Sequence, residues 1–167
     1  MAKFQALPHS TRNDLPAATR ARVGVLLNAR LADTIDLQLQ AKQAHWNVKG
    51  PHFIALHELF DKVADAAEEA SDMLAERLVA LGGRAEGTVQ AVDKRTTLRP
   101  YNLTLASGPD HVQAVADAIA TVARATREAI DDADRAGDKG TSDLFTELSR
   151  DLDKLLWLVE AHLQSPK

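Results

Sequence analysis

Apolar residues recur every three or four positions along most of this chain, which is the period of an α-helix with one buried face. The first such stretch enters through Pro16, capped by Asp14 or the residue after it, and continues to about His45. The second begins at Pro51 and runs to Leu81, where a pair of glycines follows. The pattern therefore predicts two long helices in the first half of the chain.

Two more helices are predicted in the second half. The segment Ser107–Asp110 offers a serine cap and a proline in the first turn, and the helical period then continues until it fails near Gly137 to Gly140. The last helix is expected to begin at Thr141 or Ser142 and to end near Leu163.

The connection between the second and third helices, residues 84–107, is long, and we expect a short helix within it around Thr88 to Asp93. Four long amphipathic helices with one long connection predict an all-α four-helix bundle of the crossover kind. The expected organisation is a mobile N-terminal tail over residues 1–14, the bundle over 15–163, and a short C-terminal tail over 164–167.

Composition narrows the class of protein. Hydrophobic residues make up 45% of the 167 residues and charged residues 26%, which is ordinary for a globular domain. The chain has no cysteine, so disulfides and thiolate metal sites are excluded, and a cytoplasmic location is expected. No stretch has the length of a signal peptide core or a membrane span. The net charge of −4 argues against a body that attracts nucleic acid by its own field.

Five side chains that suit a metal ion lie close together in the sequence: His45, His57, Asp61, Asp72 and Glu76. At about 100° per residue, the last four share one stripe of the second helix. Asp61 and Asp72 are nevertheless roughly 16 Å apart along that helix, too far for one ion. Either the stripe serves two sites, or an antiparallel second copy brings one chain's His57 and Asp61 against the other's Asp72 and Glu76.

Nitrogen and oxygen ligands without sulfur suit a first-row metal, with Fe(II) a natural occupant and Zn(II) or Mn(II) as alternatives. Pairs of this kind also occur by chance on solvated helix faces, so a purely structural bundle is the competing interpretation. Lys42, one turn before His45, is expected either to hydrogen-bond a carboxylate of the site or to be solvated.

The local sequence favours the metal site. KQAHWNVKGPHFIALHELFD at residues 42–61, DMLAERLVALGG at 72–83 and SRDLDKLLWLVEAHL at 149–163 closely resemble the Dps family, the mini-ferritins or DNA-binding proteins from starved cells. The resemblance covers nearly the whole chain after the tail. It implies a ferritin-like four-helix bundle that assembles from two-fold dimers into a hollow homo-dodecamer.

The same resemblance implies a ferroxidase centre at each two-fold interface. One subunit would supply His45, His57 and Asp61, and the other Asp72 and Glu76, with Asp72 more suited to orienting a ligand. Members of the family oxidise Fe(II), preferentially with hydrogen peroxide, and store ferric oxyhydroxide, which protects DNA from oxidative damage. Zn(II) would be an alternative occupant of this site. Trp46, which follows His45, matches the tryptophan of the family. It is expected either to accept an electron hole from the oxidised site or to pack at the dimer seam.

Residues outside the centre receive separate predictions. Cages of this type admit iron through acidic pores, so Asp138 and Asp143, at the turn into the last helix, are candidate pore residues. Trp157 lies in an apolar run and is expected to be core. The histidines outside the ligand set are expected to be surface or packing residues: His9, His52, His111 and His162.

Binding to DNA is expected to be weak and salt-sensitive, because the tail offers only Lys3 and Arg12 as cations, offset by Asp14. The alternative function is a DNA-compacting nucleoid protein with weak or vestigial ferroxidase activity, which a lysine-rich tail would have favoured.

Overall fold

The computed structural model describes residues 8–164, and within that range the chain forms five helices and no strand. The helices are α1 (Ala17–Asn47), α2 (Phe53–Ala80), α3 (Val89–Arg95), α4 (Gly108–Ala136) and α5 (Lys139–Glu160). Four are long, and the short α3 lies in the connection between α2 and α4, as the sequence predicts.

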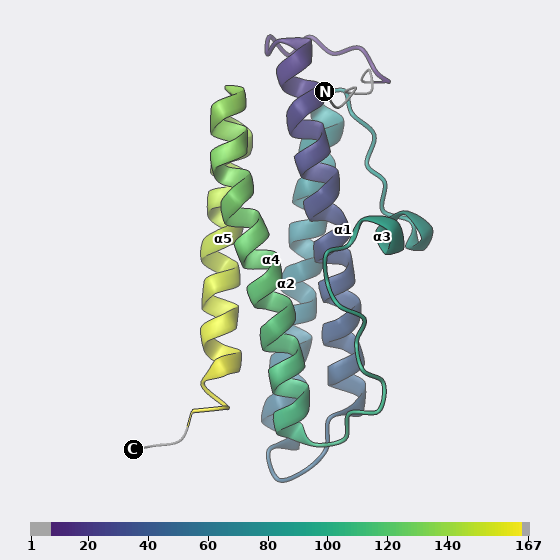
Figure 1. Cartoon of the computed structure of the whole chain (residues 1–167), viewed down its shortest axis with the longest axis vertical. Helices are drawn as coiled ribbons and strands as arrows, with labels where there is room; N and C mark the ends of the chain where they lie inside the picture. The colour runs from purple at the N-terminus through teal and green to yellow at the C-terminus, as the bar shows by residue number, and fades with distance from the viewer. Residues whose placement is uncertain (1–7, 165–167) are drawn as a thin grey trace.

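The long helices form two antiparallel pairs, α1 with α2 and α4 with α5 (Figure 1). The connection that carries α3 runs along the outside of α1 from one end of the bundle to the other, so α2 and α4 point the same way (Figure 1). This is the crossover topology expected for an all-α, ferritin-like four-helix bundle.

Helix ends follow from local capping. The Ser107 hydroxyl accepts the Asp110 N–H at 3.2 Å to start α4, and Gly137 ends it in the left-handed region with φ of 85°. The predicted start of α5 was late, because Asp138 caps the helix by accepting the Thr141 N–H at 3.0 Å. The predicted cap of α1 was also wrong: Pro16 stands at the N-cap, and no side chain bonds there.

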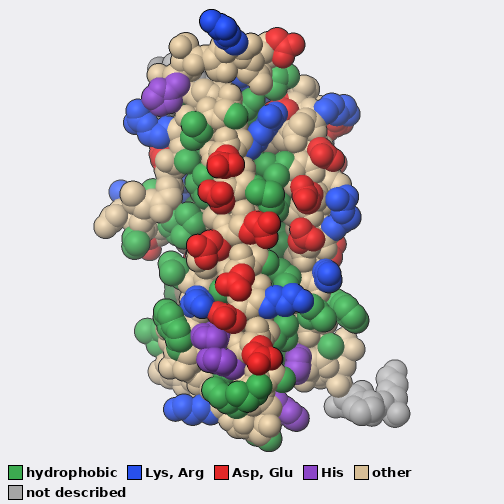
Figure 2. Space-filling model, turned by 180° about the vertical axis from the view of Figure 1, so that it is seen from behind, with side chains coloured by type: hydrophobic (Ala, Val, Ile, Leu, Met, Phe, Trp, Pro, Cys, Tyr) green, Lys and Arg blue, Asp and Glu red, His purple; other side chains and the backbone are tan. Residues whose placement is uncertain are grey.

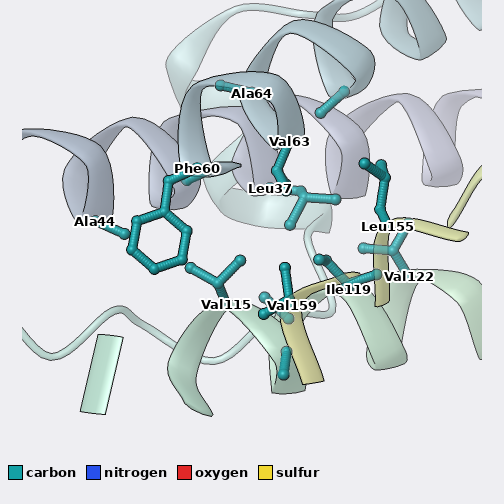
Figure 3. Close-up of a cluster of buried hydrophobic side chains, with 14 of the residues drawn as sticks. Leu37, Ala44, Phe60, Val63, Ala64, Val115, Ile119, Val122, Leu155 and Val159 are labelled. Carbon is teal, nitrogen blue, oxygen red and sulfur yellow. The ribbon is translucent and has the colours of Figure 1, made fainter. Parts of the chain in front are cut away.

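The interior is divided into two apolar clusters. One is centred on Phe60 and gathers side chains of α1, α2, α4 and α5 (Figure 3), and the other contains Leu27 and Phe145 towards the opposite end. The polar side chains of Thr34 and Ser71 are buried, and the Ser71 hydroxyl donates to the Thr34 oxygen at 2.9 Å. Hydrogen bonding satisfies both hydroxyls inside the bundle.

The connection after α3 is held to α1 by two carboxylates, one of them buried. Asp33, fully buried, pairs with Arg30 at 2.7 Å and accepts the Thr97 N–H at 2.7 Å. One turn on, Asp36 accepts the Thr96 hydroxyl at 2.6 Å. These contacts fix the path of a segment that has little regular structure, so the start of α4 is anchored against α1.

One expectation about the core was wrong. Trp157 is 63% exposed, whereas Leu152, Leu155 and Val159 of the same helix are buried. Two residues correspond to about 200° around a helix, so Trp157 points away from the face that its neighbour Leu155 buries.

At the amino-terminal end, the His9 N–H donates to the Gly82 carbonyl at 3.2 Å, which holds this part of the predicted tail against the end of α2. Residues 1–7 and 165–167 lie outside the described residues. No helix in the described range is both long and apolar enough to cross a membrane.

Candidate metal centre

The turn between α1 and α2 brings together His45, in the last turn of α1, and His57, in the second turn of α2. Their imidazole rings are stacked, with centroids 3.6 Å apart and an interplanar angle of 20°. The ring of Phe53 lies 5.1 Å from that of His57 and covers one side of the pair. Two residues that are twelve positions apart in the sequence thus form a single unit.

The two histidines bond to each other's backbone. His45 Nδ1 lies 2.8 Å from the His57 carbonyl, and His57 Nδ1 lies 2.9 Å from the His45 carbonyl. A carbonyl oxygen only accepts, so each Nδ1 carries the hydrogen and donates it. In the neutral imidazole, Nε2 then keeps its lone pair, which is the tautomer that binds a metal through Nε2. The His45 carbonyl is free to accept because the last carbonyls of a helix lack partners within it.

Asp61, one turn after His57, completes this group of ligands. Its Oδ1 contacts the Lys42 ammonium and lies 3.8 Å from His45 Nδ1. The hydrogen bond from Lys42 holds the pKa of Asp61 below its usual value, and the same contact raises the pKa of Lys42. Asp61 is thus a partly exposed anion beside the two imidazole rings, and of the two interpretations of Lys42 the one with a hydrogen bond to a carboxylate is confirmed.

Asp72 and Glu76 lie further along α2, both exposed and one turn apart. Figure 2 shows acidic side chains running in a column along this face of the bundle, with histidines near one end. Within residues 8–164 of one chain, no three histidine, cysteine, aspartate or glutamate side chains are close enough to hold an ion. The candidate ligands of a single chain therefore fall into two separate groups, here called the histidine half-site (His45, His57, Asp61) and the acidic half-site (Asp72, Glu76).

Trp46, next to His45, is 66% exposed, so the seam and electron-acceptor interpretations of this residue both stay predictions. Ile54, in the first turn of α2, is 61% exposed. These large apolar side chains flank the histidine half-site on the surface of a single chain.

Asp138 does not fit its predicted role in a pore. Its side chain is only 2% exposed, pairs with Arg77 at 2.8 Å, and accepts both the N–H and the hydroxyl of Thr141. A carboxylate committed to these donors cannot line a channel, so we assign Asp138 to capping α5. Asp143 is exposed and stays a predicted pore residue. Nothing in the local sequence reveals this clamp, because Arg77 lies 61 positions away.

The remaining predicted positions are less constrained. Lys3 lies outside the described residues, and Arg12 is exposed. His9, His52 and His162 are exposed and His111 is 1% exposed, in line with surface and packing roles.

Comparison with known proteins identifies the family and agrees with the fold. A model of the ferritin-like domain matches residues 25–167. The DNA protection during starvation protein of Agrobacterium fabrum is 49% identical over 156 residues, covering 93% of this chain and 96% of that protein. DpsA14 from Streptomyces coelicolor superposes with a TM-score of 0.90 at 36% identity, covering 96% of this chain and 95% of the other.

A structure of Dps from Microbacterium arborescens in the high iron form superposes with a TM-score of 0.82 at 33% identity, covering 87% of this chain and 95% of that one. In sequence, in fold and in the domain model that it matches, the chain belongs to the Dps family of ferritin-like proteins.

Proposed function

We propose that this protein oxidises Fe(II), preferentially with hydrogen peroxide, at centres shared between two subunits, and stores the product as ferric oxyhydroxide inside a homo-dodecameric shell. Removing iron and peroxide together would protect DNA from oxidative damage. Iron is here the substrate and the cargo. Family membership supports the general activity, and the two half-sites support the location of the chemistry.

The observation that carries the proposal is the reciprocal bonding of His45 and His57. It holds two imidazole rings in fixed orientations beside the Asp61 carboxylate, which the Lys42 ammonium would release to an ion. Binding sites that are already ordered lose little freedom when the ion arrives. A solvated stripe of charges would give no reason for both Nδ1 atoms to be bonded in this way.

An antiparallel second copy would complete each site. The two half-sites are separated by roughly 16 Å along α2, so a two-fold axis between them would place each histidine half-site against the acidic half-site of the other copy. The exposed Trp46 and Ile54 beside the histidine half-site support this arrangement, because contact with a second copy would cover them.

The chemistry follows from the charges. Asp61 and Glu76 would bring negative charge to the ion, which favours Fe(III) over Fe(II), while Asp72 would orient a ligand. Peroxide accepts two electrons, so two Fe(II), one peroxide and two waters give two FeOOH and four protons. The same ligands would also accept Zn(II), which cannot be oxidised and would act as an inhibitor.

The test is anaerobic loading with Fe(II), followed by a pulse of hydrogen peroxide recorded at the ferric absorbance. The variant His57→Ala/Asp61→Ala should lose fast oxidation. A matched control is His52→Ala/Asp65→Ala, which removes the same residue types from exposed positions of the same region and should behave as the native protein. Equal rates in all three proteins would mean that the histidine half-site is not a ferroxidase centre.

Mixing subunits tests the sharing of the site. His57→Ala/Asp61→Ala and Asp72→Ala/Glu76→Ala should each be inactive alone. Refolded together, they should regain activity, because random pairing leaves about one site in four with two intact halves. If the mixture assembles into shells but stays inactive, the two half-sites do not complete each other across subunits, and the two-fold arrangement is contradicted.

A further inference from the structure

Tyr101 and His111 form a hydrogen-bonded pair that the iron centre does not use. Tyr101 Oη lies 2.6 Å from His111 Nδ1, and the two rings are nearly parallel, with centroids 6.1 Å apart and an interplanar angle of 17°. His111, in the first turn of α4, is 1% exposed, and Tyr101, in the connection before it, is half-buried. Tyr101 is also the only tyrosine in the chain.

The protons of this pair can be assigned. Burial raises the pKa of Tyr101 to about 12, so the phenol keeps its hydrogen at neutral pH. Burial also lowers the pKa of His111, which keeps the imidazole neutral. The phenol then donates to the lone pair of Nδ1. His111 Nε2 is buried and makes no hydrogen bond of ordinary geometry within residues 8–164, although the Leu105 backbone acts against burial by raising the pKa of His111. An apolar side chain would suit this position better if packing were its only role.

The pair lies at the same end of the bundle as the histidine half-site. Tyr101 packs against the apolar cluster that contains Ala44, Leu56 and Phe60, the sequence neighbours of His45, His57 and Asp61. The start of α4 is at the same end of the bundle, since a Cβ built on Gly108 would lie 3.0 Å from Leu56 Cδ1.

We propose that Tyr101 is a redox-active residue that donates one electron to a strong oxidant formed at the iron centre, with His111 Nδ1 as the base that receives the phenolic proton. The source of the oxidant rests on the function proposed above. A phenol that has lost an electron is a strong acid, so a neutral imidazole within hydrogen-bond distance takes the proton without any movement of heavy atoms.

The need for such a donor arises when a centre holds one Fe(II) instead of two. Fe(II) and hydrogen peroxide then give Fe(III), hydroxide and a hydroxyl radical, which still lacks one electron. The balanced step consumes a hydroxyl radical, the Tyr101 phenol, neutral His111 and one solvent proton. Its products are water, the Tyr101 phenoxyl radical and protonated His111. The next Fe(II) to bind restores the pair: it becomes Fe(III), the phenoxyl radical takes its electron, and His111 returns the proton.

The test uses the full-length assembled protein, loaded anaerobically with less than one Fe(II) per centre and frozen within milliseconds of a peroxide pulse. Electron paramagnetic resonance should show a tyrosyl radical in the native protein and its loss in Tyr101→Phe. Because there is one tyrosine, this signal needs no further assignment. A radical that is unchanged in Tyr101→Phe would belong to a tryptophan and would overturn the proposal.

The role of His111 is tested by His111→Leu, which removes the base and keeps an apolar side chain in the core. The native radical should show coupling to an exchangeable proton, lost in D2O, and His111→Leu should lose both that coupling and most of the radical yield. Should this variant fail to assemble, the comparison of native protein in H2O and D2O still decides the point. A native radical without an exchangeable proton would overturn the assignment of His111.

A photogenerated one-electron oxidant, applied without iron, separates this proposal from the iron chemistry. A tyrosyl radical formed by light in protein that does not oxidise Fe(II) would support the pair and overturn the proposed function. Normal Fe(II) oxidation with no tyrosyl radical under either oxidant would leave the proposed function standing and overturn the role of Tyr101.

Discussion

Arg77, near the end of α2, donates from Nη2 to the buried carboxylate of Asp138 at 2.8 Å, and its Nε donates to Thr141 Oγ1 at 3.0 Å. Asp138 also caps α5, so one carboxylate both starts a helix and joins the two helical pairs. Arg77 directly follows Glu76, and the clamp therefore also fixes the turn of α2 that carries the acidic half-site.

Asp138→Ala should lower the free energy of unfolding by about 2–4 kcal/mol, because it removes a cap and leaves a partly buried guanidinium unpaired. Denaturant unfolding at fixed protein concentration measures this, since assembly itself contributes to stability. The control is Asp143→Ala at an exposed position, expected to change stability by no more than about 0.5 kcal/mol. Equal effects of the two substitutions would argue against the clamp.

Asp143→Asn should slow the uptake of iron while leaving shells assembled, if this exposed carboxylate helps to concentrate cations at a pore. The rate of iron retention by the shell measures the effect, which should shrink as salt rises. Asp153→Asn removes an exposed carboxylate that pairs with Arg127 and serves as the control. Unchanged uptake in Asp143→Asn would place the entry route elsewhere.

Lys42→Met should tighten the binding of Fe(II), because the ammonium competes with a cation for Asp61. Stability should change little, since the pair is solvent-accessible. Anaerobic titration with Fe(II) at neutral pH gives the binding constant, and Lys62→Met, an exposed lysine of α2, is the matched control. Weaker binding in Lys42→Met alone would instead mean that Lys42 holds Asp61 in its binding position.

His111 should contribute to acid destabilisation. Because burial lowers its pKa in the folded chain, the unfolded chain binds the proton more tightly. The stability of the neutral form is fully present above about pH 6.5, the ordinary imidazole value, and is lost as pH falls through the lowered folded value. His111→Leu should therefore flatten the pH dependence of unfolding in this window. The exposed His162→Leu should leave it unchanged.

Binding to DNA should be weak. A gel shift with plasmid at about 50 mM salt, where phosphate contacts are favoured, should show little retained complex. Deletion of residues 1–12 tests whether the tail is responsible for the DNA that the protein retains in the gel shift. A strongly retained complex that disappears on this deletion would favour the DNA-compacting alternative.

The helices and the topology were predictable because each rests on many residues that share one period. The five candidate ligand positions came from spacing together with the resemblance, and they stay predictions; only the folded chain shows that His45 and His57 bond to each other's backbone. The start of α5 was misjudged because Asp138 was interpreted as a pore residue and its role as the N-cap, three residues before Thr141, was missed. Trp157 was misjudged because an apolar run hides which of its members faces inward. The pairing of Tyr101 with His111 depends on the path of an irregular segment, for which the sequence has no periodic signal.

The reciprocal bonding of His45 and His57 depends on the length of the turn between α1 and α2. Each ring reaches the other's carbonyl only if residues 48–52 keep their length, so one inserted or deleted residue would undo both bonds and both ligands together, even with every helix intact. Loops usually tolerate changes in length. Engineering of this protein should therefore leave the turn between α1 and α2 at its present length.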